Sequence, residues 1–154
     1  NIRKNHLGEI QKLLHFVEEN ISLATIVRAS DEDFLNLFGF HLGNEAYKLV
    51  QQLGCNFLVF TKGKAGAEVY FPEGMQAIVA NPVEVVSTIG AGDSFNAGLI
   101  TRLISLGLTV DNLWHITGQG WAKLLDYAVI FAGDVCGSLD NYISLETGEN
   151  FHVR

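Results

Sequence analysis

Apolar residues recur along the chain with two different periods, and these periods predict helices and strands in alternation. In residues 7–17 the apolar positions lie three and four residues apart, which is the spacing of one helix face. The same reasoning predicts helices at 30–39, 44–53, 90–106 and 121–135, with a short helical start at 111–113. Gly118 and Gly120 are expected to interrupt the helical pattern between 113 and 121, because glycine weakens helices.

Short β-branched and apolar runs predict strands at 21–29, 57–60, 67–71, 76–80 and 83–86. The run 57–60 is apolar on both faces, as a central parallel strand requires, and the glycine-bearing turn 63–66 makes 67–71 its hairpin partner. Residues after Ser138 lack periodicity and are expected to form a surface tail. The alternation predicts the α/β class, with a doubly wound, mostly parallel sheet and helices on both faces.

Composition and charge narrow the class of protein. A chain of 154 residues with 48% hydrophobic and 18% charged residues is expected to fold as one domain. The net charge of −7 argues against a surface that grips nucleic acid or an anionic membrane by charge. No apolar run reaches the roughly 18 residues of a membrane span, and no signal peptide is evident, so we expect a cytoplasmic protein. Cys55 and Cys136 are expected to be buried free thiols.

One glycine-rich segment, 85–98, carries the candidate chemistry. A predicted strand ends, Gly90, Ala91 and Gly92 follow, and Asp93 stands in the first turn of a helix. Glycines let a bulky anion approach the main chain, and the unpaired N–H groups of a first helical turn favour its negative charge. The segment is not a Walker loop, because no Lys-Ser/Thr follows the last glycine, and its spacing excludes the dinucleotide fingerprint.

An acid beside an anion cradle predicts phosphoryl transfer to an alcohol. Asp93 would accept the hydroxyl proton, while the N–H groups of Gly90, Ala91 and Gly92 stabilise the transferring phosphoryl group. This chemistry requires Asp93 to face an open crevice rather than a packed interior. The alternative is that the small residues only let the helix pack on the strand, with Asp93 as a stabilising charge at the helix N-terminus.

The run 88–98 closely resembles the C-terminal signature of the ribokinase-like (PfkB) carbohydrate kinases. In that family the Asp of Gly-Ala-Gly-Asp is the catalytic base and the preceding small residues form the anion hole. Residues 61–66 resemble the family's Thr-x-Gly-x-x-Gly turn, which contacts nucleotide phosphates, and 30–33 stand where the family carries Asn-x-x-Glu. Residues 1–3 resemble the end of the family's Asp-x-Asn-x-Arg strand.

The resemblance implies a set of site residues. The catalytic set is Asp93 with the amides of Gly90, Ala91 and Gly92, and the nucleotide set is Thr61, Lys62, Gly63, Gly66, Thr88 and Asn96. Ser30 and Asp33 would act on Mg²⁺ indirectly, through the magnesium–phosphate group, although they also match a helix cap. Ser87 stands where the family most often has an Asp near a monovalent-cation site, and a hydroxyl is a weaker, uncharged ligand for K⁺.

The resemblance also implies the function. We expect a sugar kinase that uses ATP and Mg²⁺, that acts on a primary hydroxyl, and that has no nucleic-acid or membrane partner. Fructokinases and 2-keto-3-deoxygluconate kinases are the most similar in motif. A nucleoside or vitamin kinase, and a non-catalytic nucleotide-binding regulatory relative, are the alternatives.

The matching segments account for one half of such a kinase. Residues 1–154 are expected to be a single C-terminal portion that carries the nucleotide site and the catalytic base, without the family's N-terminal half and its β-sheet lid. The first residue, Asn1, fits this interpretation because it is not Met. We expect this portion alone to bind sugar poorly and to turn over slowly or not at all, and the full-length enzyme to have the option of forming a homodimer.

Overall fold

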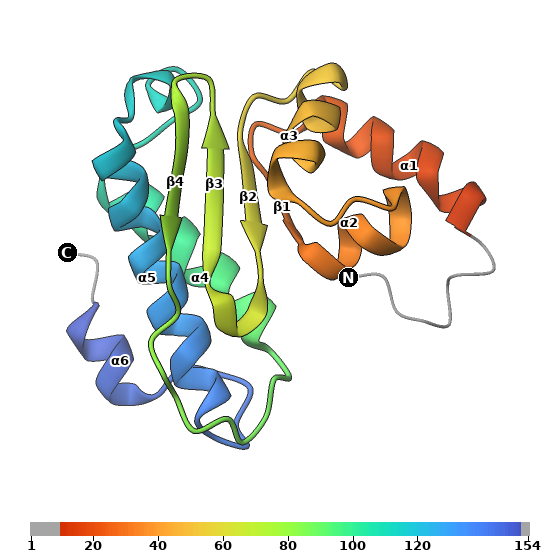
Figure 1. The fold of residues 1–154 in the computed structure, drawn as a ribbon. Coiled ribbons are helices and arrows are strands. Elements are labelled where there is room, and N and C mark those ends of the chain that lie inside the picture. The colour runs from red at the N-terminus through yellow and green to blue at the C-terminus, as the bar shows by residue number, and fades with distance from the viewer. Residues whose placement is uncertain (1–9, 152–154) are drawn as a thin grey trace. The chain divides into compact units, whose positions relative to one another are not determined.

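A computed structural model describes residues 10–151, which belong to two compact units (Figure 1). The first unit comprises Asn1–Gly63 and Ala67–Ala77, and the second comprises Lys64–Gly66 and Ile78–Arg154. The predicted match to residues 1–3 lies outside the described residues.

The first unit contains a run of helices and a four-stranded sheet whose last strand ends one residue into the second unit. Its helices are α1 (Ile10–Leu23), α2 (Asp31–Phe38) and α3 (Gly43–Gln52). The strands are β1 (Val27–Ser30), β2 (Leu58–Thr61), β3 (Ala67–Phe71) and β4 (Gly74–Ile78), and they lie in the order β1-β2-β3-β4. Helices that alternate with strands confirm the α/β class.

The predicted hairpin of β2 and β3 is confirmed, and because of it the sheet is less parallel than the predicted fold class. Strands β1 and β2 are parallel, with Ser30 opposite Thr61, whereas β2 and β3 are antiparallel, with Thr61 opposite Ala67. The cause is the connection between β2 and β3, which is only the short 3₁₀ turn η2 (Gly63–Ala65). A turn of this length can join only antiparallel neighbours, because a parallel return needs a crossover of about a dozen residues or more.

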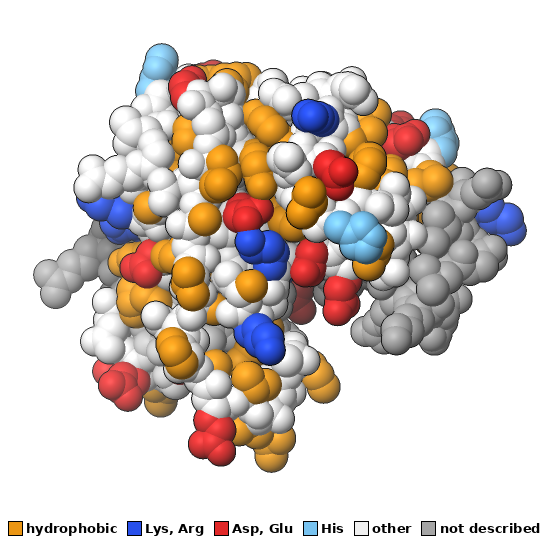
Figure 2. Space-filling view, viewed as in Figure 1, with side chains coloured by type: hydrophobic (Ala, Val, Ile, Leu, Met, Phe, Trp, Pro, Cys, Tyr) orange, Lys and Arg blue, Asp and Glu red, His pale blue; other side chains and the backbone are white. Residues whose placement is uncertain are grey.

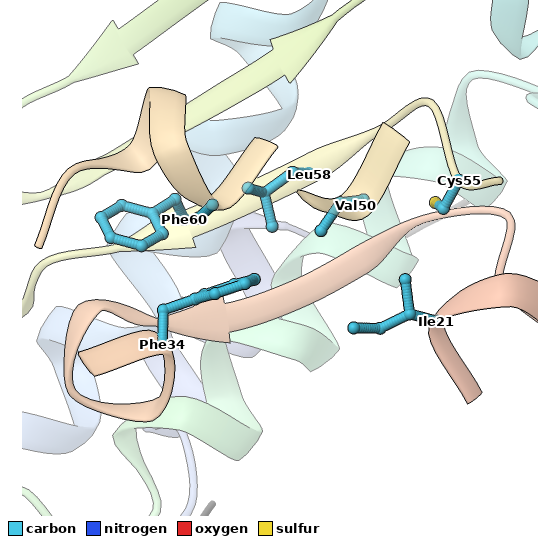
Figure 3. Close-up of a cluster of buried hydrophobic side chains, with 7 residues drawn as sticks. Ile21, Phe34, Val50, Cys55, Leu58 and Phe60 are labelled. Carbon is cyan, nitrogen blue, oxygen red and sulfur yellow. The ribbon is translucent and has the colours of Figure 1, made fainter. Parts of the chain in front are cut away.

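The core of the first unit lies between its helices and one face of β2 (Figure 3). Seven buried side chains form it: Ile21, Phe34, Ala46, Val50, Cys55, Leu58 and Phe60. The rings of Phe34 and Phe60 lie next to each other, with centroids 5.9 Å apart. The other face of β2, with Val59 and Thr61, is buried too, which explains why the strand is apolar nearly throughout.

The second unit is mainly helical. It contains α4 (Ala91–Ser105), the 3₁₀ turn η3 (Leu113–His115), α5 (Gly118–Cys136) and α6 (Leu145–Asn150). Helices α4 and α5 pack against each other and lie side by side in Figure 1. The inner face of α5 is apolar and fully buried at Trp121, Leu124, Leu125 and Ala128.

Four details of the predicted elements are wrong. Ile21 belongs to α1 rather than to a strand, and residues 83–86 form no strand. Gly118 and Gly120 begin α5 instead of interrupting it, because the Thr117 hydroxyl caps the helix by accepting a hydrogen bond from the Gly120 N–H at 3.2 Å. The tail expected after Ser138 contains α6, which Ser144 caps in the same way.

The described surface carries mixed charges. On the face shown in Figure 2, Lys and Arg side chains stand apart from one another, among acidic and apolar side chains. None of the helices described is long and apolar enough to cross a membrane. Both cysteines are free; Cys55 is buried as expected, whereas Cys136 is only half-buried, and this burial raises the pKa of its thiol.

The core of the first unit predicts a contrast between two neighbouring positions of α2. Phe34 is 2% exposed and Leu35 is 41% exposed. Phe34→Ala should lower the free energy of unfolding by about 3 to 5 kcal/mol, because it leaves a cavity beside Phe60. Leu35→Ala, the matched control, should cost well under half as much. Urea unfolding followed by circular dichroism measures both, and equal losses would contradict the placement of this core.

Candidate functional site

The predicted anion cradle forms the N-terminus of α4. Gly90 is the N-cap and has a φ of 83°, a left-handed conformation that favours glycine. A Cβ added to Gly90 would lie 3.0 Å from the carbonyl oxygen of Asn141, so glycine is also needed for space. The Ser94 N–H donates to the Gly90 carbonyl at 2.8 Å, and no side chain caps the helix. Among the described residues, the first turn therefore has no side-chain cap.

Several backbone donors of this turn remain available. The Ala91 N–H donates to the Thr88 carbonyl at 3.3 Å, which is a long hydrogen bond. The N–H groups of Gly90, Gly92 and Asp93 have no acceptor among residues 10–151. Unpaired donors in the first turn, together with the helix dipole, make a favourable place for an anion.

The Asp93 side chain is exposed, as the predicted chemistry requires. It is the third residue of α4, and the next two residues, Ser94 and Phe95, are buried and hold that part of the helix against the rest of the unit. Asn96 follows three residues after Asp93 and is half-buried. Residues three apart share a helix face, so Asp93 and Asn96 both border the open end of α4.

The chain that enters this turn is held by the last turn of α5. The Cys136 carbonyl accepts hydrogen bonds from the Val86 N–H at 2.8 Å and from the Ser87 N–H at 3.3 Å. The Ser87 hydroxyl accepts from the Ile89 N–H at 3.2 Å, while Thr88 is exposed. Ser87 therefore helps to shape the turn, and its proposed role toward K⁺ stays a prediction.

The position of α4 itself depends on Gly98. A Cβ at this buried glycine would lie 2.8 Å from the Tyr127 carbonyl oxygen and 2.9 Å from the Ala128 Cα. Both of these atoms belong to the backbone of α5, which cannot easily move aside. The missing side chain at Gly98 thus lets the two helices approach closely, and this contact helps to set the position of α4 relative to α5.

The remaining predicted residues lie mainly in the first unit. Ser30 and Thr61 stand opposite each other at the carboxyl ends of β1 and β2. The Thr61 hydroxyl accepts a hydrogen bond from the Arg28 guanidinium at 3.1 Å. Gly63 begins η2, and Gly66 follows η2 in the second unit. The structure thus brings one group together near the carboxyl ends of β1 and β2: Ser30, Asp33, Thr61 and Lys62. A second group lies at the start of α4: Ser87, Thr88, residues 90–93 and Asn96.

Lys62, predicted to neutralise phosphate, is engaged in an ion pair with Glu68. The Glu68 carboxylate also accepts a hydrogen bond from the Tyr70 hydroxyl at 2.7 Å. Burial, together with the hydrogen bond and the charge of Glu68, raises the pKa of Tyr70 and keeps this hydroxyl protonated as a donor. Lys64, two residues further on, is exposed.

Ser30 and Asp33 form a capping box at the start of α2. The Ser30 hydroxyl accepts from the Asp33 N–H at 3.1 Å, and Asp33 Oδ2 accepts from the Ser30 N–H at 3.1 Å and from its hydroxyl at 2.7 Å. The capping alternative considered from the sequence is confirmed. Within the described ranges, no three His, Cys, Asp or Glu side chains are grouped to hold a metal ion.

The sequence did not indicate Asn141 or the Cys136 carbonyl. Asn141 lies beside Gly90, and the Cys136 carbonyl binds the segment that enters the cradle. Both come from about 50 residues downstream, and contacts of this kind leave no motif.

Comparison with known proteins places the chain in a family. Residues 9–147 match the family model described as pfkB family carbohydrate kinase, and the chain belongs to this family. Aminoimidazole riboside kinase of Salmonella typhimurium is 30% identical over 103 residues, which are 67% of this chain and 32% of that protein. A fructokinase of Salmonella thompson is 30% identical over 112 residues, which are 72% of this chain and 51% of that protein.

Solved structures share the fold. Aminoimidazole riboside kinase from Salmonella enterica, with its riboside and an ATP analog, has a TM-score of 0.77 at 22% identity, over 98% of this chain and 48% of that one. Fructokinase from Vibrio cholerae, with fructose, ADP and calcium, has a TM-score of 0.72 at 26% identity, over 85% of this chain and 41% of that one. An E. coli protein assigned as ribokinase II, with ATP and Mg²⁺, has a TM-score of 0.75 at 23% identity, over 98% and 46%.

These matches confirm the ribokinase-like α/β fold that the motifs predicted. The chain spans about a third to a half of the length of the relatives it matches.

The close approach at Gly98 predicts an inverted substitution effect. Gly→Ala inside a helix normally stabilises by roughly 0.5 to 1 kcal/mol. Gly98→Ala should instead lower the thermal midpoint, because its methyl group would meet the α5 backbone. Ala97 is exposed and next to Gly98, and Ala97→Gly should lower the free energy of unfolding only by the usual difference in helix propensity, about 1 kcal/mol. A stabilised Gly98→Ala variant in differential scanning calorimetry would contradict the packing described.

Proposed function

We propose that this chain is the nucleotide-binding and catalytic-base portion of a sugar kinase, which transfers the γ-phosphoryl group of ATP to a primary hydroxyl of a carbohydrate. The observation that carries this proposal is the exposed Asp93 carboxylate in the same helical turn as the open Gly90, Gly92 and Asp93 amides. The carboxylate can accept a proton from an alcohol, and the unpaired N–H donors beside it can stabilise the negative charge of a phosphoryl group.

In the proposed reaction, Asp93 accepts the hydroxyl proton of the sugar as the sugar oxygen attacks the γ-phosphorus of ATP. The bond between this phosphorus and the β,γ-bridging oxygen breaks, and ADP leaves. The amides of the Gly90–Gly92 turn and of Asp93 donate to the phosphoryl oxygens, on which negative charge is spread in the transition state. The Ala91 N–H joins them by leaving its long bond to the Thr88 carbonyl. Asn141 lies close beside Gly90, and we expect this proximity to limit the movement of the other donors when the nucleotide binds.

ATP and Mg²⁺ are the proposed cofactors. Structural relatives that bind an ATP analog, ADP, or ATP with Mg²⁺ support this. When bound, Mg²⁺ would neutralise charge on the nucleotide phosphates. Residues 10–151 contain no group of three acidic, His or Cys side chains for the ion, and Asp33 Oδ2 already accepts two hydrogen bonds from Ser30. Ser30 and Asp33 would therefore act on the ion through the phosphates.

The nucleotide contacts proposed outside the cradle are Thr61, Lys62, Gly63 and Gly66, together with Thr88 and Asn96. Lys62 would have to exchange its ion pair with Glu68 for a phosphate, whereas Thr88 is already exposed beside the cradle.

The proposed acceptor is a fructose-like sugar or a keto-deoxy sugar acid, supported by the fructokinases among the relatives. A specific observation favours a second candidate, a riboside kinase: the sequence match and the structural match both include aminoimidazole riboside kinase.

Asp93 provides the direct test of catalysis. In the full-length protein, Asp93→Asn should lower kcat by roughly two to four orders of magnitude, because the amide cannot take the proton, while ATP affinity stays within about twofold. Asp126→Asn, an exposed acid on α5, is the matched control and should leave kcat unchanged. A coupled ADP-release assay and calorimetric ATP titration measure both variants. Full activity in Asp93→Asn would refute the role of Asp93, and no activity in the unmodified protein would favour the non-catalytic relative.

The acceptor is tested by a screen of the full-length protein with Mg-ATP. Fructose or 2-keto-3-deoxygluconate should give the highest kcat/KM, with ribose lower. A riboside such as aminoimidazole riboside as the best acceptor would replace the sugar-kinase proposal with the second candidate. The readout is ADP release, with product identity checked by mass spectrometry.

A further inference from the structure

The last turn of α5 and the loop that follows it lie next to the two chain segments that shape the cradle. On the entering side, the Cys136 carbonyl accepts from the Val86 and Ser87 amides, three to four residues before Gly90. On the other side, the loop that follows α5 brings Asn141 against Gly90. The end of α5 is therefore the common support of the phosphate-binding turn.

Asp134 fastens the far end of this loop. Its Oδ2 accepts a hydrogen bond from the Ser144 N–H at 2.6 Å, and its Oδ1 accepts from the Ser144 hydroxyl at 3.1 Å. Hydrogen bonds to an ionised carboxylate are shorter and stronger than neutral ones. An acid at a helix C-terminus is disfavoured by the helix dipole, and α5 has no basic residue in its last turn. The bonds to Ser144 offset this cost.

Ser144 connects Asp134 both to helix α6 and to the loop that carries Asn141. It is the N-cap of α6, where its hydroxyl accepts from the Thr147 N–H at 3.1 Å. Toward the cradle, a short loop connects it to the end of α5. Inside that loop the Ser138 hydroxyl accepts from the Asp140 N–H at 2.9 Å and donates to the Asp140 carbonyl at 3.2 Å. The loop is thus braced internally on one side of Asn141 and tied to α5 on the other.

We propose that Asp134 is a positioning residue for nucleotide binding: through Ser144 it holds the loop that presses Asn141 against Gly90 and so fixes the phosphate-binding amides. This inference rests on the proposed function. Without the bond, the loop can move away from Gly90, and the amides at the start of α4 lose the contact that keeps them in place for a phosphate.

A rival explanation is charge alone. Asp134 and Asp140 both line a pocket of about 390 Å³ at the end of α5, so either acid could influence a nearby anion. The two differ in connection, because the Asp140 side chain has no hydrogen bond within residues 10–151. Asp140→Asn removes a charge from the same pocket and leaves the tether intact.

The test compares Asp134→Ala, Ser144→Ala, their double variant and Asp140→Asn in the full-length protein. Asp134→Ala should weaken ATP binding on the order of tenfold, since a charge-assisted hydrogen bond is lost, with the sugar KM within twofold. Ser144→Ala keeps the hydrogen bond from the Ser144 N–H to Asp134, and it should therefore weaken ATP binding less than Asp134→Ala does. The double variant should equal Asp134→Ala, because both changes cut one tether. Asp140→Asn should bind ATP normally.

Hydrogen exchange at the Ser144 amide provides a readout that does not depend on activity, and it should become faster in Asp134→Ala. The proposal would be overturned if Asp134→Ala had normal ATP affinity despite faster exchange at Ser144. It would also be overturned if Asp140→Asn weakened ATP binding as much as Asp134→Ala, or if the double variant lost the sum of the two single losses in ATP affinity. If Asp134→Ala does not fold, unchanged ATP affinity in Ser144→Ala overturns it. An unmodified protein that does not bind ATP contradicts the proposed function itself, which separates the two failures.

Discussion

The approach of α4 to α5 at Gly98 is the contact on which the candidate site depends. Gly98 faces backbone atoms of Tyr127 and Ala128, so the two helices meet main chain to main chain. This contact sets where α4 starts, and therefore where the amides of its first turn and the Asp93 carboxylate stand. The same neighbour, α5, holds the entering chain through the Cys136 carbonyl. One helix thus influences both the position of the Gly90–Asp93 turn and the path of the chain that enters it.

The elements that sequence patterns predict well are those whose signals are local. Ser30 and Gly39 mark the ends of α2 because a hydroxyl cap and a left-handed glycine act within a few residues. β2 is recognisable because both of its faces are buried. Residues 83–86 mislead because β-branched side chains satisfy the propensity of a strand while no neighbouring strand pairs with them. Gly118 and Gly120 mislead because the cap at Thr117 outweighs their poor helix propensity.

The candidate site divides in the same way. The order of Gly90, Ala91, Gly92 and Asp93 is contiguous, so their shared turn could be predicted, together with the exposure of Asp93 that the chemistry requires. The proximity of Asn141 to Gly90 and the bond between Asp134 and Ser144 could not, because they involve a loop that returns to the turn after a whole helix. Ser30 and Asp33 show a further limit: the residues of a helix cap and of a phosphate–magnesium motif are the same, and the structure establishes the cap.

The shared Cys136 carbonyl links the order of the cradle to the end of a helix. A terminal turn frays more readily than a helix interior, and its local opening has a lower free energy than global unfolding. When this turn of α5 opens, the Val86 and Ser87 amides lose their acceptor in the same event. We therefore expect the segment before Gly90 and the end of α5 to open together, so that a phosphate held by the cradle would reduce fraying at a helix end that it does not touch.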